Sequence, residues 1–292
     1  MGTRTGRLKS SETHRAEIRY ERDMEQLDEE VSLLTTRVLE GEKSFLSRIT
    51  QGRKIRPRRT MLYGVQGVGK STWASMAPQP IFLPTEDGLG DIDCESFPLF
   101  TKFEDVIGAL KELASSEHNY GTAVVDSLDW LEQLIWDYTC REGQQKSIEA
   151  FGYGKGYMEA LQHWREFLRL LDVLCLTRDM SVILLAHAKI ERFEAPETQS
   201  YDRNVPRLHK TASGLVQEWC DEVFFATYKV FTKVEKGKFN KEVTKAVGSG
   251  ERIVRTSERP FAMAKNRLGF PDEIPLDYRV YAEMLKEKQK GA

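Results

Sequence analysis

Short apolar runs alternate along the chain with longer segments in which apolar residues recur every three or four positions. The short runs end in polar or glycine residues, which is typical of buried strands, and they are Met61–Tyr63, Ile81–Leu83, Ala123–Val125 and Val182–Leu185. The longer segments predict helices over residues 106–113, 128–138 and 161–175. Strands that alternate with helices and are buried on both faces indicate a parallel sheet wrapped by helices, so the predicted fold class is α/β.

The pattern changes after the last of these helices. Consecutive strand-like runs follow without a helix in each gap, and they are Val223–Val234, Arg252–Thr256 and Phe261–Ala264. Strands that succeed one another in this way pair antiparallel. We therefore expect an antiparallel extension of the sheet.

Residues 1–50 have a pattern of their own. Their apolar positions are spaced alternately by four and three residues, at Tyr20, Met24, Leu27, Val31, Leu34 and Val38. This stripe is shorter than the three to four heptads that define a coiled coil, so it predicts one amphipathic helix. The helix packs either on its own domain or on a neighbouring subunit. The predicted organisation is an N-terminal helical arm over residues 1–50 and a main domain over residues 51–292.

Charge excludes one class of function and leaves local patches. The 292 residues carry 43 Lys and Arg against 45 Asp and Glu, a net of −2, so the chain does not coat nucleic acid through bulk charge. Six cations between Arg48 and Arg59 stand without an acid, and residues 229–259 have a net charge of +5. These patches are either solvated surface or contacts to phosphate backbones.

The expected location is cytoplasmic. The early cations are not followed by the apolar segment of a secretory signal, and no apolar run reaches the length of a membrane span. The four cysteines lie at least 35 residues apart and form no Cys-x-x-Cys pair. That spacing is typical of reduced thiols.

The clearest chemical signal is Gly64-Val65-Gln66-Gly67-Val68-Gly69-Lys70-Ser71, which fits G-x-x-x-x-G-K-[ST] between a predicted strand and a predicted helix. Glycines let the backbone amides of such a loop, the P loop, face phosphate oxygens. Lys70 would reach the β- and γ-phosphates, and Ser71 would place its hydroxyl on Mg²⁺. The segment Gly64–Thr72 is therefore predicted to bind a nucleotide, with ATP and Mg²⁺ as cofactors.

Three polar residues follow predicted strands at the edge where open α/β sheets bind ligands. Asp126 ends the run Thr122–Val125, beside the P loop, and is the expected second support of the Mg²⁺ shell. Glu86 follows the second strand and His187 the fourth. Glu86 is either a functional carboxylate or a solvated loop acid, and His187 is either functional or a buried structural histidine.

A second basic feature lies far from the P loop in sequence. Lys265 and Arg267 leave a predicted strand in the segment Ala264-Lys-Asn-Arg-Leu-Gly269. Two cations so close together form either a solvated turn or a site for an anion.

The sequence resembles the RecA/RadA recombinase-core ATPases, because these motifs occur along the chain in the same order. More narrowly, it resembles the phage-encoded RecA-like ATP-binding proteins associated with single-strand annealing recombination. The resemblance covers roughly residues 58–280, and the stretches that carry it are Leu62–Trp73, Ile81–Gly88, Val124–Ser127, Tyr201–Arg203, Leu208–Phe224, Gly250–Arg252 and Lys265–Pro271. Residues 1–50 have no counterpart, and no separate DNA-binding domain is appended.

The resemblance implies a role for each of these residues. Glu86 would activate the attacking water, and His187 would sense the γ-phosphate. Lys265 and Arg267 would reach across a subunit boundary to the nucleotide of the neighbour, which implies self-association into a ring or filament. In a phage-encoded protein the location would be the cytoplasm of the bacterial host.

The resemblance also implies two DNA-binding loops. The first is Gly152–Tyr157, where Tyr153 and Tyr157 offer stacking faces and Lys155 a phosphate contact. The second is Ala188–Thr211, with Arg203, Arg207 and Lys210 as candidate contacts. Both segments are otherwise plain polar surface loops.

The sequence therefore favours an ATP-hydrolysing, RecA-like protein that acts on single-stranded DNA in recombination, annealing or replication. Two alternatives remain open. One is an ATP-dependent clamp or loader for a single-strand annealing or single-strand binding protein, and the other is a small-molecule P-loop kinase. No membrane partner is expected.

Overall fold

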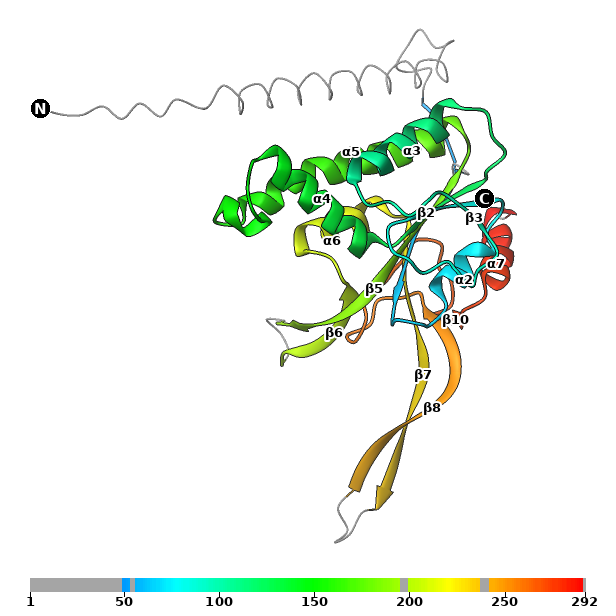
Figure 1. Cartoon of the computed structure of the whole chain (residues 1–292). Helices are drawn as coiled ribbons and strands as arrows, with labels where there is room; N and C mark the ends of the chain where they lie inside the picture. Colours follow the sequence, from blue (N-terminus) through cyan, green and yellow to red (C-terminus); the bar gives the residue numbers. More distant parts are fainter. Residues whose placement is uncertain (1–48, 53–55, 195–198, 237–241, 291–292) are drawn as a thin grey trace, which may run out of the picture.

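A mixed sheet with helices on both faces forms the centre of the molecule (Figure 1). The computed structural model describes residues 49–52, 56–194, 199–236 and 242–290. The strands are β1 (Arg59–Gly64), β2 (Pro80–Pro84), β3 (Glu95–Ser96), β4 (Thr122–Asp126), β5 (Ser181–Phe193), β6 (Tyr201–Pro206), β7 (Glu222–Lys236), β8 (Glu242–Arg255), β9 (Lys265–Asn266) and β10 (Glu273–Pro275). The helices are α2 (Lys70–Ser75), α3 (Phe103–Ser115), α4 (Leu128–Glu142), the 3₁₀ helix η2 (Ile148–Phe151), α5 (Lys155–Thr177), α6 (Lys210–Trp219) and α7 (Tyr278–Lys290).

The parallel part of the sheet runs in the order β7-β1-β5-β4-β2-β3. The strand that leads into the P loop, β1, therefore lies between β5 and β7, and β4 with Asp126 lies one strand further along. All four strands and all three helices expected from the apolar pattern are present. This arrangement confirms the α/β fold with a mostly parallel sheet flanked by helices.

Alternating side chains of the strands fill two cores, one on each face. Met61, Val125 and Leu184 belong to the core under α3, α4, α5 and α6. Leu62, Val124 and Leu185 belong to the core that contains residues of α2 and α7. Strand side chains point alternately to opposite faces, so continuous apolar runs are required for a sheet covered on both sides.

The antiparallel extension is confirmed in part and corrected in part. β7 begins parallel to β1 and then continues beyond it, pairing antiparallel with β8. Residues Phe261–Ala264 do not form the predicted strand, because the backbone turns back between Arg259 and Ala262 around Pro260. The next strands are β9, which pairs with the start of β7, and β10, which pairs with the end of β8.

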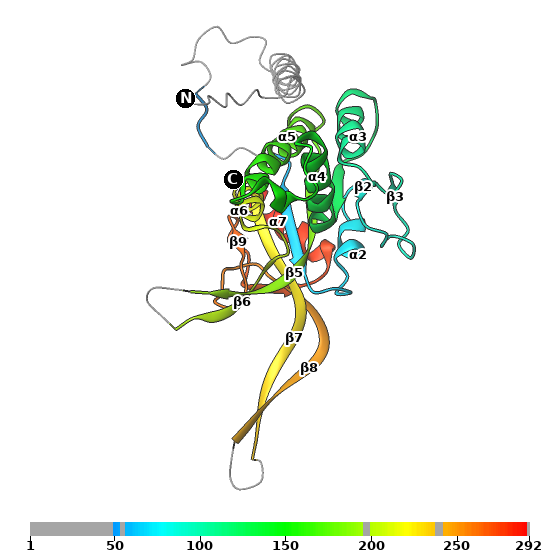
Figure 2. The same cartoon turned by 60° about the vertical axis from the view of Figure 1, so that its left-hand side comes forward.

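Two β-hairpins project from the edge of the sheet that carries the P loop (Figures 1 and 2). The first is β5–β6, paired from Ala188 with Pro206 to Phe193 with Tyr201. It replaces much of the loop expected over residues 188–211. The second and longer one is the β7–β8 ribbon, whose register shifts between Tyr228 and Val230, where it leaves the sheet.

The predicted helix over residues 20–38, and with it nearly all of the arm over residues 1–50, lies outside the described residues. All four cysteines carry free thiols. Among the described residues, no helix is long and apolar enough to cross a membrane.

Candidate functional site

Close packing fixes the P loop between β1 and β7. A Cβ at Gly64 would come within 2.2 Å of the carbonyl oxygen of Ala226, so only glycine fits where these strands meet. Gly69 has a φ of 101°, in the left-handed region that favours glycine, and it is the N-cap residue of α2. Lys70 follows directly and is buried, with Nζ donating to the carbonyl oxygen of Val65 at 3.3 Å. The predicted phosphate loop therefore has its strand–loop–helix setting.

The two residues predicted to support Mg²⁺ meet at this loop. Ser71 Oγ donates to Asp126 Oδ2 at 2.5 Å. Asp126 is buried, and its Oδ1 has no hydrogen-bond partner among the described residues. Burial raises the pKa of this carboxyl, while Ser71 and Lys70 act in the opposite direction. A buried carboxylate oxygen without a partner, beside a serine hydroxyl, is a donor set that fits Mg²⁺.

Backbone contacts bring Glu86 to the same place. Thr85 Oγ1 donates to the carbonyl oxygen of Ser127 at 2.7 Å, and the amide of Glu86 donates to that of Asp126 at 3.3 Å. These bonds join the end of β2 to the end of β4. Glu86 thus lies beside Asp126 and keeps part of its side chain accessible to solvent.

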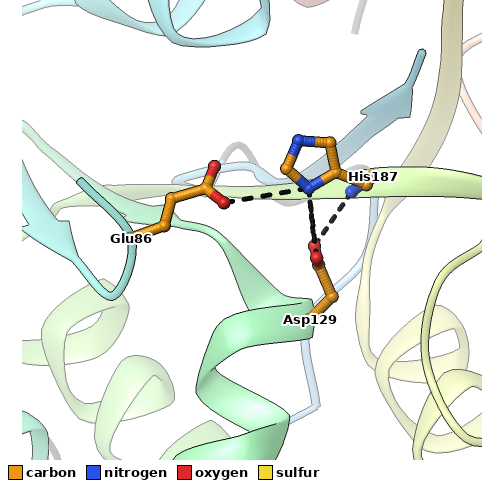
Figure 3. A group of neighbouring side chains, drawn as sticks. All are labelled: Glu86, Asp129 and His187. Atoms are coloured by element: carbon orange, nitrogen blue, oxygen red, sulfur yellow. Dashed lines mark hydrogen bonds and ion pairs between the residues drawn. The ribbon is translucent and has the colours of Figure 1, made fainter. Parts of the chain in front are cut away.

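His187 stands between two carboxylates in the middle of β5, where the pairing of β5 with β1 ends and its pairing with β6 begins (Figure 3). Its Nδ1 lies 3.1 Å from Asp129 Oδ2 and 3.9 Å from Glu86 Oε2. Its backbone amide also donates to Asp129 Oδ1, at 3.0 Å. The carboxylate of Asp129 therefore fixes both the backbone and the ring of His187 next to Glu86.

Asp129 is a site residue that the sequence reasoning missed. It lies in the first turn of α4, three residues after Asp126, and is almost completely buried. An acid on the buried side of a helix, so close to a strand-terminal aspartate, is the signal that could have pointed to it.

Arg207, one of the predicted DNA contacts, also belongs to this cluster, and its contact with DNA stays a prediction. Its guanidinium donates to Asp129 and lies 3.3 Å from His187 Nδ1. Its backbone amide donates to the carbonyl oxygen of His187 at 2.8 Å, where β6 ends against β5. The base of the β5–β6 hairpin is thus bonded to Asp129 and His187, and His187 is the neighbour of Glu86.

Shared burial of opposite charges sets the pKa values of the site. Burial works to raise the pKa of Asp129, but hydrogen bonds from His187 and Arg207 outweigh it and hold this pKa well below its usual range. Burial raises the pKa of Glu86, and Asp126 and Asp129 add to that shift. Burial also lowers the pKa of Lys70. A carboxylate whose basicity is raised beside a fixed anion is suited to accept a proton.

Glu86, Asp129 and His187 could also be viewed as a metal cluster, since they offer ligand atoms within 4.8 Å of one another. However, the guanidinium of Arg207 lies against Asp129 and would repel a cation there. We therefore describe the three residues as a hydrogen-bonded group that adjoins the Mg²⁺ ligands.

The β7–β8 ribbon contacts the P loop on its other side, through two residues that sequence reasoning did not assign. Tyr228 Oη donates to the carbonyl oxygen of Gly67 at 3.3 Å, and Arg252 Nη1 donates to that of Val68 at 3.4 Å. Tyr228 and Arg252 are paired across the ribbon. Such contacts depend on the register of two distant strands, so no local pattern indicates them.

The other predicted DNA contacts divide into exposed and packed residues. Tyr153, Lys155 and Lys210 are exposed. Tyr157 instead stacks on His209, with ring centroids 3.9 Å apart. Arg203 is buried, ion-paired with Glu258 and packed over the ring of Phe193.

Lys265 and Arg267 lie at the opposite edge of the sheet, because β9 pairs with the first residues of β7. Lys265 Nζ donates to the carbonyl oxygens of Gln217, Glu218 and Cys220 near the end of α6. Arg267 is 3.1 Å from the buried carboxylate of Asp221. Neither side chain reaches the P loop of its own chain, and their contact with a neighbouring subunit stays a prediction.

Comparison with known proteins places the chain in a family. Among solved structures, the RadB recombinase is similar, with 15% identity, a TM-score of 0.35 and coverage of 70% of this chain and 93% of that one. No curated protein matches the chain. The profile of a family described as "AAA domain" matches residues 56–268, a span that contains the P loop, Glu86, Asp126 and His187. With most of its length matched, and with a P-loop ATPase core built around these residues, the chain belongs to this AAA domain family.

Proposed function

We propose that the protein is a Mg²⁺-dependent, RecA-like ATPase that acts on single-stranded DNA, in the manner of phage-encoded ATPases of single-strand annealing recombination. The observation that carries the proposal is the direct contact between the base of the β5–β6 hairpin and Glu86, Asp129 and His187, which together are called the hydrolytic group below. Arg207, at the base of β5–β6, donates to Asp129, and Asp129 holds His187 beside Glu86. A strand that binds at this hairpin can therefore affect hydrolysis without a long relay.

The chain's own residues divide the work of hydrolysis. The P-loop amides and Lys70 bind and orient the phosphates, and Glu86 accepts a proton from the attacking water. Ser71 and Asp126 would hold Mg²⁺, which supplies charge that screens the phosphate oxygens. Asp129 orients His187 through Nδ1, so that Nε2 is turned away from Asp129 (Figure 3), and in the doubly protonated ring Nε2 can donate toward a terminal phosphate.

Self-association is part of the proposal. Lys265 and Arg267 would neutralise charge on the nucleotide of a neighbouring subunit in a ring or filament. Their contacts in this chain are with backbone carbonyl oxygens and with Asp221, so reaching a neighbour requires an exchange of these partners.

Subunit mixing tests this shared site. Lys70→Ala disables the P loop, and the double variant Lys265→Ala/Arg267→Ala disables the cations, so each alone is expected to be inactive. Mixed oligomers contain interfaces where an intact P loop faces intact cations, and part of the ATPase activity should return. If mixed oligomers form and no activity returns, the two cations act only within their own subunit.

The central test compares the ATPase rate with and without single-stranded DNA, with oligomer size measured in the same samples. We expect hydrolysis to release phosphate and to be faster with DNA. Hydrolysis that ignores DNA but responds to an annealing or single-strand binding protein would replace the proposal with the clamp or loader alternative.

A further inference from the structure

A cavity of about 410 Å³ opens directly beside the hydrolytic group, and the proposed function does not account for it. Its lining residues are Asp129, Trp130, Glu132, Gln133, Trp136, Lys189, Arg207, Leu208 and His209. Its volume lies in the range of small-ligand sites, so it admits one ring-bearing residue or nucleotide rather than a folded partner.

One wall of the cavity is a stripe of α4. Asp129, Glu132, Gln133 and Trp136 follow the spacing of one helix face, and Trp130 stands at its rim with 48% of its surface exposed. Trp136 is supported from behind by Tyr157, at 5.4 Å between ring centroids, and Tyr157 is stacked on His209. The aromatic wall is therefore held in place by packing.

The facing wall is cationic and comes from the β5–β6 hairpin and its exit. Lys189 Nζ donates to the carbonyl oxygen of Leu208 at 3.0 Å, and the half-exposed Arg207 follows the end of β6. The amide of His209 donates to both oxygens of the buried carboxyl of Glu132, at 2.9 and 3.0 Å. Gln133 adds an exposed amide with both donor and acceptor atoms.

We propose that this cavity binds one unstacked base of a single-stranded nucleic acid, with the base against Trp130 and the adjoining phosphate on Lys189 and Arg207. An aromatic face opposite cations is the arrangement that recognises single strands, because each nucleotide offers a planar ring and an anion together. A base within a duplex is stacked on both sides and cannot enter a cavity of this size. This inference rests on the proposed function and assigns the cavity as the place where the single strand binds.

The cavity shares two residues with the hydrolytic group. Asp129 and Arg207 line it, and the same two residues fix His187 beside Glu86. A phosphate that binds Arg207 competes with Asp129 for the guanidinium. Occupation of the cavity therefore changes the hydrogen bonding of His187 within the site, which connects strand binding to hydrolysis.

The test uses the full chain and two labelled oligonucleotides of equal length, oligothymidylate and an abasic strand with the same phosphates. Wild type should bind oligothymidylate about 10-fold more tightly than the abasic strand, in the range expected for one base stack. Trp130→Ala should remove that preference, and Trp130→Phe should restore part of it. Because Trp130 lies at the rim, its replacement leaves both cores intact. Leu176→Ala is the control, since Leu176 is exposed near the end of α5, at the opposite edge of the sheet, and should behave as wild type.

A second measurement, of DNA-stimulated hydrolysis, distinguishes failure of the cavity assignment from failure of the proposed function. The ratio of ATPase rates with and without oligothymidylate should fall toward unity in Trp130→Ala.

If Trp130→Ala keeps both the preference for bases and the stimulation, the cavity assignment is wrong while the proposed function stands. If thymidine monophosphate competes as well as the strand does, the occupant is a free nucleotide and the strand assignment is wrong. If Trp130→Ala alters only oligomer size, the cavity takes a protein side chain instead. If wild type binds neither oligonucleotide, the proposed function itself fails.

Discussion

Two hairpins leave the same edge of the sheet, and they are attached to different parts of the nucleotide site. β5–β6 is attached through Arg207 and His187 to Asp129, next to the residue that would activate water. β7–β8 is attached through Tyr228 and Arg252 to the carbonyl oxygens of the P loop. Since β5 and β7 are the two neighbours of β1, the P loop lies between the bases of both hairpins.

The difference lies in the kind of contact. The base of β5–β6 is joined by charged groups around a buried carboxylate, where losing one partner leaves a charge uncompensated and costly. The base of β7–β8 is joined by hydrogen bonds from side chains to neutral carbonyl oxygens, each of modest net energy. We therefore expect β5–β6 to govern turnover and β7–β8 to govern how tightly the nucleotide is held.

The largest effect should come from Glu86, the residue that would activate water next to the base of β5–β6. Glu86→Gln keeps the shape of the side chain and removes its basicity, so turnover should fall about 100-fold or more while ATP affinity is retained. Steady-state ATPase assays and nucleotide titration measure the two quantities. Asp87→Asn, at the exposed neighbouring position, is the matched control. Turnover at the wild-type rate in Glu86→Gln would show that another group activates the water.

Breaking the base of β5–β6 should have the next largest effect. Asp129→Asn weakens the bonds to His187 and Arg207 together, and turnover should fall roughly 10-fold or more, since at least one charged hydrogen bond is lost from the site. ATP affinity should change little, because Asp129 holds the hydrolytic group rather than the P loop. Asp137→Asn, exposed on the same helix, controls for the loss of a charge. A rise in KM with an unchanged kcat would instead place Asp129 in nucleotide binding.

Breaking the base of β7–β8 should give the opposite pattern with a smaller size. Tyr228→Phe removes the hydroxyl that donates to Gly67, and Arg252→Gln weakens the contact with Val68. Each should weaken ATP binding about 2- to 10-fold and leave kcat near its wild-type value, since each variant disturbs a single long hydrogen bond to a carbonyl oxygen. Phe231→Leu, further out on the same strand, is the control. Equal losses of kcat in the variants of both hairpins would remove the distinction between them.

The sequence was sufficient for the parts of this site that local patterns encode. The P loop, Asp126, Glu86 and His187 depend on neighbours in the chain and on the common edge of parallel strands, although β5 continues past His187, where the apolar run predicted its end. The fold followed in the same way, because runs buried on both faces have few alternatives. The Phe261–Ala264 strand was wrong because a turn at Pro260 outweighed its apolar content.

The residues that connect the hairpins to the site could not be predicted in this way. Asp129 is explained only by the approach of β5 and by the guanidinium of Arg207, which is 78 residues away in sequence. Tyr228 and Arg252 meet the P loop because β7 continues past the end of β1 and pairs Tyr228 with Arg252 of β8. These are tertiary contacts between distant segments. The buried position of Asp129 on α4 could have indicated the residue, but a single sequence carries no local signal for the contacts themselves.

The smallest expected effect sharpens the comparison from the side of β5–β6, because the carboxyl of Glu132 holds the exit of that hairpin at His209. Burial raises the pKa of Glu132 from 4.5 to about 7, although the His209 amide and Lys189 act in the opposite direction. The folded chain therefore keeps a proton that the unfolded chain has lost, so this group makes stability fall as the pH rises from about 4.5 to about 7. The slope is at most about 1.4 kcal/mol per pH unit, and each kcal/mol corresponds to roughly 2–4 °C in Tm.

Glu132→Gln stays neutral and keeps an acceptor for His209, so its Tm should fall less over this range than that of wild type. Thermal unfolding at several pH values measures this, with Glu112→Gln on the exposed side of α3 as the control. If the curves of wild type and Glu132→Gln run parallel, Glu132 is already ionised in the folded protein, and the exit of the hairpin is held by a charged pair with Lys189 instead.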